Sequence, residues 1–134
     1  MRHQFLSKPR KRRKCPEYIF HCHVADALDK ILDPELTCWS SIENSNHTGG
    51  TSGKIKQSKD KRKGVKAGVP DVFILYSGTC LWIELKAGYN GTSEPQDLFH
   101  KKIRKAGSIV VVVRTIDELM TILEQYEVPT LIKE

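Results

Sequence analysis

The sequence predicts an α/β fold in which helices flank a mixed β-sheet, with elements in the order α-β-β-β-α-β-α. Two neighbouring segments, 71–76 and 79–86, alternate apolar and polar side chains in the way that half-buried strands do. Residues 108–113 form an apolar run, which is typical of a strand covered on both faces. Segments with helical periodicity surround these strands, so helices and strands belong to one layered unit.

Length and composition predict the domain organisation. The chain has 134 residues, 39% of them hydrophobic and 28% charged, so we expect a flexible basic leader over residues 1–14 and one domain over residues 15–134. No apolar run has the length of a membrane-spanning helix, and the N-terminus lacks the apolar core of a signal peptide. We therefore expect an intracellular protein without a membrane partner, in the cytoplasm or nucleoid, or in the host cell if the protein is viral.

Charge and cysteine content narrow the function. The formal net charge of +6 favours a polyanionic partner. The four cysteines, at positions 15, 22, 38 and 80, include no CxxC pair, so zinc-site spacing is absent and reduced thiols are expected.

Residues 16–32 predict the first helix. Pro16 suits the first helical position, and Pro34 ends the segment. Its apolar stripe, at spacings of three and four residues, consists of Tyr18, Cys22, Ala25, Leu28 and Leu32. A short strand is expected over residues 37–42, followed by a loop over the turn-forming residues 43–53.

The segment Lys54–Lys66 carries seven Lys or Arg residues and few apolar ones, and is expected to be a frayed helix or a mobile flap. It leads directly into the strand that begins near Asp71, so we interpret it as a strip that contacts phosphates beside the site. A solvated linker is the alternative. The candidate nucleic-acid-binding residues in this segment are Lys54, Lys56, Lys61, Arg62, Lys63 and Lys66.

A hairpin forms the centre of the prediction, with Ser77-Gly78 as its two-residue turn. This turn places Asp71 opposite Glu84. Alternation then divides the side chains between two faces. The apolar face consists of Val72, Ile74, Leu81, Ile83 and Leu85, and the other face carries Asp71, Phe73, Trp82, Glu84 and Lys86.

The facing carboxylates of Asp71 and Glu84 predict a cation site. Opposed Cβ atoms in a sheet lie about 5 Å apart, and like charges at that distance repel. A divalent cation turns the repulsion into attraction, and oxygen ligands suit Mg²⁺ or Mn²⁺. Lys86 leans to the same side and can reach a phosphate or a metal-bound water. If these charges only kept a hairpin face soluble, Phe73 and Trp82 on that face would be unexplained.

Two more helices are expected downstream. Ser93 and Gln96 form a capping box for one helix, which ends at Gly107 and whose inward residues are Leu98, Phe99, Ile103 and Ala106. Thr115 and Glu118 form a second capping box, for a helix whose inward residues are Leu119, Ile122 and Leu123. The segment 128–132 is short and apolar, and can be an added strand or part of a dimer contact.

The string from Lys63 to Asp71, KGVKAGVPD, followed by Glu84-Leu85-Lys86 and then Gln96, resembles the virus-type replication-repair nuclease (VRR-Nuc) domain of the PD-(D/E)XK nuclease superfamily. The resemblance covers roughly residues 17–126. It implies a restriction-endonuclease-like core and a Mg²⁺-dependent endonuclease. In that family the Gly-Val-Pro-Asp prefix and the downstream Gln accompany the acidic pair.

The resemblance also implies roles for particular residues. Asp71, Glu84 and the Leu85 carbonyl bind the metal, Lys86 acts on the attacking water or the transition state, and Glu17 completes the acidic site. The helix dipole also favours a carboxylate in the first turn of a helix, which is an alternative reason for Glu17 at this position.

Gln96 is expected at the active site, besides its capping role, and Asn44 or Asn46 follows the first predicted strand. Arg114 is a further candidate phosphate contact.

The implied substrate is branched DNA, such as a four-way (Holliday) junction or a flap in DNA repair. Symmetrical cutting of a junction needs two sites, hence a homodimer. No small-molecule substrate is expected. Two alternatives stay open: a basic nucleic-acid-binding module without catalysis, and a ribonuclease or restriction-like nuclease on the same core.

Overall fold

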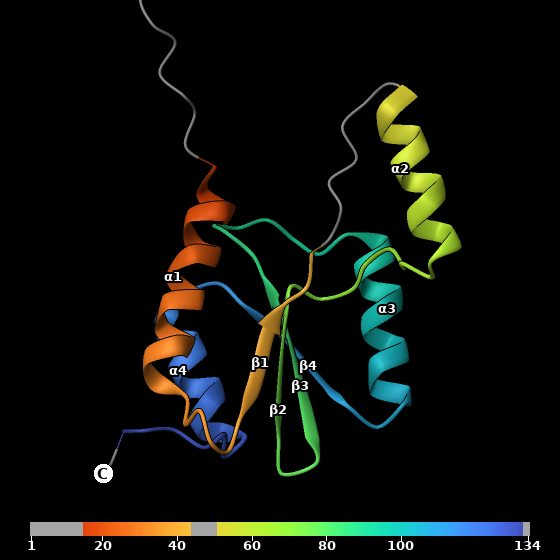
Figure 1. Cartoon of the computed structure of the whole chain (residues 1–134). Coiled ribbons are helices and arrows are strands. Elements are labelled where there is room, and N and C mark those ends of the chain that lie inside the picture. The colour runs from red at the N-terminus through yellow and green to blue at the C-terminus, as the bar shows by residue number, and fades with distance from the viewer. Residues whose placement is uncertain (1–14, 44–50, 133–134) are drawn as a thin grey trace, which may run out of the picture.

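The computed structural model describes residues 15–43 and 51–132, and within these ranges it contains four helices and four strands (Figure 1). The helices are α1 (Pro16–Ile31), α2 (Thr51–Arg62), α3 (Glu94–Lys105) and α4 (Ile116–Gln125). The strands are β1 (Cys38–Ser41), β2 (Val72–Tyr76), β3 (Thr79–Leu85) and β4 (Ile109–Val113). The predicted leader lies outside the described residues, as do Asn44 and Asn46. None of the helices in the described ranges is long and apolar enough for a membrane span.

The strands form one mixed sheet in the order β1-β2-β3-β4. The pairs β1–β2 and β2–β3 are antiparallel, and β4 is parallel to β3. The predicted hairpin register is confirmed, with Val72 opposite Ile83. Its turn has positive φ angles at Ser77 (48°) and Gly78 (73°), as the hairpin turn of type I′ requires.

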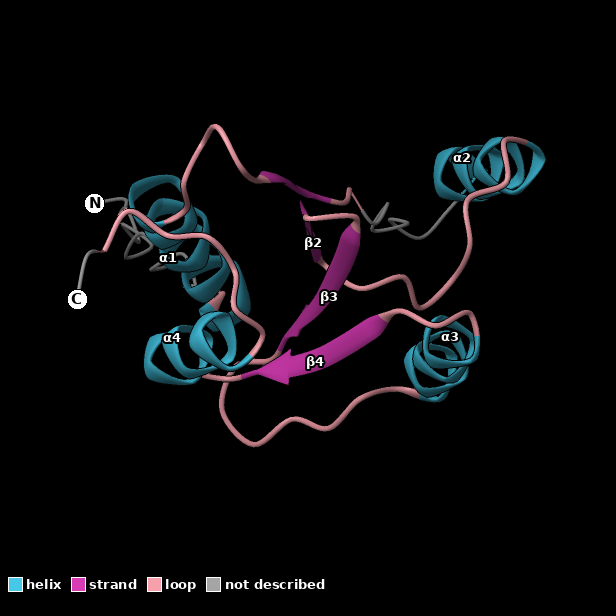
Figure 2. Ribbon diagram, turned by 90° about the horizontal axis from the view of Figure 1, so that it is seen from below, coloured by secondary structure: helices cyan, strands magenta, loops and turns pink. Residues whose placement is uncertain are grey.

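Helices cover both faces of the sheet (Figure 2). α1 and α4 lie on one face, and α2 and α3 lie on the other. The main core is between the sheet and the α1–α4 layer. The apolar hairpin face that alternation predicts lies in this core, where each of its members is at most 2% exposed: Val72, Ile74, Leu81, Ile83 and Leu85.

The structure corrects the predicted element order in one place. The segment that the sequence left as a frayed helix or a flap is helical as far as Arg62, and this helix, α2, already begins at Thr51, inside the predicted loop 43–53. The observed order is therefore α-β-α-β-β-α-β-α. The exposed side chains of Lys54, Lys56 and Lys61 lie on this helix. Lysine and glutamine have good helix propensity, so a helix forms here without an apolar stripe.

The predicted apolar stripe of α1 is partly wrong. Tyr18 and Cys22 are exposed, whereas Val24 and Leu28 are buried and Phe20 packs against the core. Phe20, Val24 and Leu28 repeat every four residues, so they also share one helical face. This face removes more apolar surface from water than the predicted one, since it replaces a thiol and a phenol by an aromatic ring and a branched aliphatic group.

The inward face of α3 also differs from the prediction. Leu98 is 54% exposed, and the buried residues of the helix are Ile103 and His100. The reason is that the first two turns of α3 face the buried carboxylate of Glu84. The polar side chains of Gln96 and His100 can contact this group, and a leucine cannot. Hydrophobic periodicity carries no information about such a neighbour.

Both predicted helix starts exist. The capping box at Ser93 is complete, because its hydroxyl accepts from the Gln96 N–H and the Gln96 side chain accepts from the Ser93 N–H at 2.9 Å. At α4, Thr115 accepts from the Glu118 N–H at 3.1 Å. The Glu118 carboxylate accepts from the Arg114 N–H at 2.7 Å, so the second box is only half formed.

The segment after α4 is no strand. The Leu131 N–H donates to the Ile31 carbonyl at 2.8 Å, and Thr130 forms an isolated bridge with Leu32. These contacts attach residues 128–132 to the end of α1. The dimer contact that the sequence left open for this segment stays a prediction.

Gly68, in the loop before β2, lies in close contact with the beginning of α3. Its φ is +84°, and a Cβ atom there would lie 2.1 Å from the Pro95 carbonyl oxygen and 2.8 Å from the Gln96 nitrogen. Two backbone segments therefore approach closely at this point, which only glycine permits. The contact positions the first turn of α3 against the loop that leads to Asp71 and β2.

We expect Gly68→Ala to displace the start of α3 and to lower the free energy of unfolding by about 1–3 kcal/mol. Two variants are matched controls: Gly64→Ala, where φ is +86° but no atom lies within 4 Å, and Gly91→Ala, where neither condition holds. Chemical denaturation of the three variants separates backbone strain from the close approach. Equal losses in Gly68→Ala and Gly64→Ala would contradict a role for the contact with Pro95.

Candidate active site

The candidate site lies at one edge of the sheet. β2 begins at this edge, and β1, β3 and β4 end there, because β2 is antiparallel to both β1 and β3, and β4 is parallel to β3. Asp71 immediately precedes β2, and Glu84 is the last residue but one of β3. Backbone hydrogen bonds secure the edge, from the Ile42 N–H to the Asp71 carbonyl (2.8 Å) and from the Lys86 N–H to the Val113 carbonyl (3.1 Å).

The carboxylates of Asp71 and Glu84 face each other across the two strands, as the hairpin register predicts. The Leu85 N–H donates to Asp71 Oδ2 at 2.8 Å, which holds that side chain against β3. Glu84 is only 1% exposed. Burial, and secondly the charge of Asp71, raise the pKa of Glu84 to about 8, although Lys86 acts in the opposite direction. Without a cation, Glu84 therefore keeps its proton to a higher pH than an exposed glutamate does.

Lys86 lies beside this pair. Its Nζ is 3.8 Å from Glu84 Oε1, and its side chain is 11% exposed. The charges of both Asp71 and Lys86 act on the Glu84 carboxyl, in opposite directions. The structure therefore gathers the predicted side chains of Asp71 and Lys86 around Glu84.

Gln96 reaches the same carboxylate from α3. Its Nε2 donates to Glu84 Oε1 at 2.6 Å, while its Oε1 accepts from the Ser93 N–H at 2.9 Å. The sequence offered two interpretations of Gln96, as a capping residue and as an active-site residue. The side chain makes both contacts at once, one with each end of its amide.

His100 was missed by sequence reasoning. It is 4% exposed, and its Nε2 lies 3.6 Å from Glu84 Oε2, which is beyond hydrogen-bonding distance. Burial, followed by the charge of Arg104, lowers the pKa of His100. The available signal was its spacing of four residues from Gln96, which places the two side chains on one face of the helix.

Glu17 approaches from α1. It lines a cavity of about 470 Å³ together with Asp71, Leu85 and Glu43, at the outer side of the carboxylate pair. Its charge also contributes to the raised pKa of Glu84, behind burial, Asp71 and Lys86 in size of effect. α1 is connected to β1 here by a 2.8 Å hydrogen bond between His21 Nε2 and Ser41 Oγ. The structure thus places Glu17 at the rim of the site.

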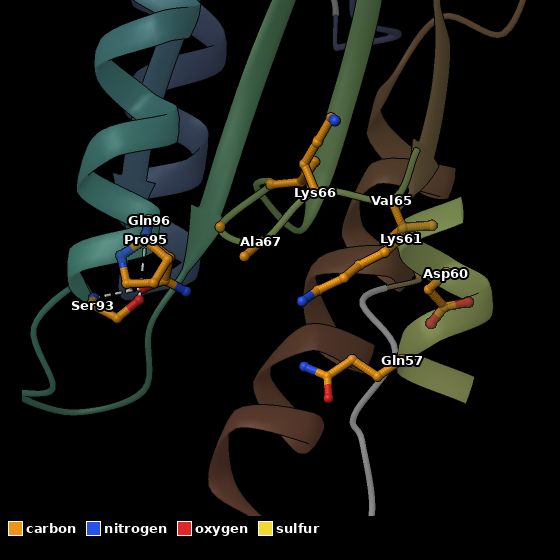
Figure 3. Close-up of a pocket in the computed structure, with 11 residues that line it drawn as sticks. Gln57, Asp60, Lys61, Val65, Lys66, Ala67, Ser93, Pro95 and Gln96 are labelled. Carbon is orange, nitrogen blue, oxygen red and sulfur yellow. Dashed lines mark hydrogen bonds between the residues drawn. The ribbon is translucent and has the colours of Figure 1, made fainter. Parts of the chain in front are cut away.

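The basic candidates lie on the other side. Lys61 and Lys66 line a cavity of about 370 Å³, whose opposite wall includes Ser93, the N-cap of α3, and Pro95 and Gln96 in its first turn (Figure 3). Figure 3 shows Gln57 and Lys61 extending from α2 toward that wall. Since Gln96 contacts Glu84, the cavity adjoins the carboxylate site. The remaining predicted bases of this segment are exposed, namely Lys54, Lys56, Arg62 and Lys63.

Arg114 has an internal contact. Its Nη1 donates to the carbonyls of Gly88 (3.0 Å) and Asn90 (2.6 Å), in the loop between β3 and α3. It therefore attaches this loop to the end of β4. A contact between Arg114 and phosphate stays a prediction.

The donor set of the site fits a hard divalent cation. The described residues contain no group of three or more His, Cys, Asp or Glu side chains placed to hold a metal ion. A cation here would thus use the two carboxylates, a backbone carbonyl and water, which is the mixture of oxygen ligands that Mg²⁺ accepts. Glu84 is 1% exposed and the charge of Asp71 disfavours its ionised form, so a cation between the two carboxylates would offset both effects, which supports the fit.

Without metal, we expect the free energy of unfolding to fall as the pH rises from about 4.5 to about 8. In this interval folded Glu84 keeps a proton that the unfolded chain has released, so stabilisation is complete below the lower value and lost through the upper one, at up to about 1.4 kcal/mol per pH unit. Denaturation in a chelator at several pH values should show a flatter profile for Glu84→Gln than for exposed Glu124→Gln. Identical profiles would contradict the raised pKa.

Comparisons with known proteins establish the fold. A solved structure described as a VRR_NUC domain protein matches this chain with a TM-score of 0.62 and 22% sequence identity, over 87% of this chain and 93% of that chain. No protein-family model matches the chain, and no curated protein matches it significantly. The predicted α/β class, a mixed sheet flanked by helices, is confirmed, and the chain has the fold of a VRR_NUC domain protein.

Proposed function

We propose that this chain is a metal-dependent nuclease of the VRR-Nuc type, which hydrolyses phosphodiester bonds in DNA. The observation that carries the proposal is the facing pair of Asp71 and Glu84, one of them buried, with Lys86 beside them. A structural role does not require two carboxylates at such a cost in desolvation and repulsion. The shared fold with a VRR_NUC domain protein supports the same function.

The chain's residues would divide the chemistry as follows. Asp71, Glu84 and the Leu85 carbonyl would hold Mg²⁺ or Mn²⁺, and Glu17 at the rim would hold a water or help with a second ion. When bound, the cation would supply an acidified water and neutralise charge on the phosphate. Lys86 would donate to a phosphate oxygen or, in its neutral form, take the proton of the attacking water. Gln96 holds Glu84 Oε1 through its Nε2.

The substrate path would cross the basic side of the molecule. Lys61 and Lys66 line the cavity that adjoins Gln96, and further lysines continue along α2. A phosphate backbone lying on this surface would be directed toward the carboxylate pair. Basic side chains of this kind read no base sequence, which supports recognition of DNA structure.

Branched DNA and a homodimer are the finer part of the proposal. The sequence has no helix-turn-helix or zinc-finger pattern, which agrees with selection by shape. Two copies related by a twofold axis would present two sites to a four-way junction. Sedimentation with and without junction DNA measures this assembly.

Asp71→Asn should reduce cleavage by about 1,000-fold or more, because loss of a metal ligand removes several kcal/mol of transition-state stabilisation. Asp29→Asn, an exposed position on α1, is the control. The assay uses Mg²⁺ with linear duplex, flap, splayed and four-way junction DNA, and with RNA. Cleavage that persists in Asp71→Asn would exclude Asp71 from the mechanism, and binding without cleavage by the unsubstituted protein would favour a non-catalytic module. Preferential cleavage of RNA would favour a ribonuclease.

Replacement of Lys61 and Lys66 by alanine should weaken DNA binding, because each lysine that neutralises a phosphate releases counterions on binding. The slope of log affinity against log salt should fall by about 1 for each phosphate that is no longer neutralised. Lys30→Ala, in the last turn of α1, is the matched control. Fluorescence anisotropy at several salt concentrations measures the slope. An unchanged slope in the double variant would remove this cavity from the DNA path.

A further inference from the structure

Two buried polar atoms face each other behind the carboxylate pair without a hydrogen bond. Among the described residues, Glu84 Oε2 and His100 Nε2 are the buried side-chain nitrogen or oxygen atoms that have no hydrogen-bond partner. They are 3.6 Å apart, and the two residues are 1% and 4% exposed. Buried polar groups are nearly always paired, so an orphaned pair in mutual contact points to a function.

The position of His100 follows from α3. Gln96 and His100 are one helical turn apart, so their side chains project from the same face. The capping box and the close contact between Gly68 and Pro95 hold the first turn of this helix against the sheet. Gln96 contacts Glu84 Oε1, and His100 faces Oε2. Two side chains of one helix thus lie next to the two oxygens of a single carboxylate.

We propose that His100 is a positioning residue for Glu84, with Nε2–H donating to Oε2 so that α3 holds both carboxylate oxygens. A movement of about half an ångström brings the two atoms within hydrogen-bonding distance. Gln96 alone leaves the carboxylate free to rotate about its contact, whereas two donors one turn apart orient its plane. The metal-binding consequence rests on the proposed function.

A carboxylate oriented in this way would bind a cation more tightly. Groups that hold a metal ligand from behind typically contribute 10- to 100-fold in metal affinity or activity, roughly the range expected here. A histidine that only fills space would affect stability and leave the affinity unchanged. Metal affinity therefore distinguishes positioning from packing.

Two conservative variants test the proposal. His100→Gln places an amide nitrogen near the position of Nε2, whereas His100→Asn places one near Nδ1 and cannot reach Oε2. Mn²⁺ binding by isothermal titration calorimetry should be weakened about 10-fold or more in His100→Asn and stay close to that of the unsubstituted protein in His100→Gln. Lys102→Ala, exposed on the same helix, is the control. Equal Mn²⁺ affinities for His100→Asn and His100→Gln would overturn the proposal.

A second measurement needs neither a variant nor a metal. Long-range ¹H–¹⁵N correlation spectra of the unsubstituted protein, recorded above the Glu84 pKa of about 8 so that the carboxylate has lost its proton, should show the neutral His100 ring with its proton on Nε2. A proton on Nδ1, with Nε2 unprotonated, would overturn the proposal. Mn²⁺ binding without any nucleic-acid cleavage would refute the nuclease while leaving the role of His100 supported by the binding data. Absence of Mn²⁺ binding in the unsubstituted protein would overturn both.

Discussion

The electrostatic repulsion between Asp71 and Glu84 is the constraint on which the rest of the structure depends. The two carboxylates meet where the central hairpin ends, and Glu84 is almost completely removed from water. Burying an uncompensated charge is unfavourable, so the surrounding chain has to supply donors at fixed positions. It supplies the Leu85 N–H, the Lys86 ammonium and the Gln96 amide.

These donors come from two elements of different kinds, and the fold holds the two together. The hairpin supplies the Leu85 N–H and Lys86, through its turn and its buried apolar face. α3 supplies Gln96, through its capping box and its close contact with Gly68. The Gly-Val-Pro-Asp segment is therefore more than a leader for Asp71. Its glycine, Gly68, packs against the first turn of α3, which carries the Gln96 that contacts Glu84. One stretch of chain therefore helps to position both Asp71 and Glu84.

The sequence predicted the parts of the site that depend on local periodicity. The two-residue turn and the alternation of side chains were sufficient for the hairpin register, and hence for Asp71 opposite Glu84. The capping pattern was sufficient for the start of α3. His100 could not be predicted in this way, because its burial depends on what the helix packs against. The prediction of the buried face of α1 was wrong for the same reason. Tyr18 and Phe20 lie on two different apolar stripes, and only the packing selects which of them is buried.

Arg114 connects parts of the molecule that the sheet separates. Its backbone N–H binds Glu118 at the start of α4, while its guanidinium binds the carbonyls of Gly88 and Asn90 in the loop that leads to α3. These hydrogen bonds restrain the loop, so fewer conformations remain for the chain between Lys86 and Ser93. Less conformational entropy is then lost when α3 docks. Arg114 thus connects the beginning of α4 with the loop that leads from Lys86 to α3, through its backbone N–H on one side and its guanidinium on the other.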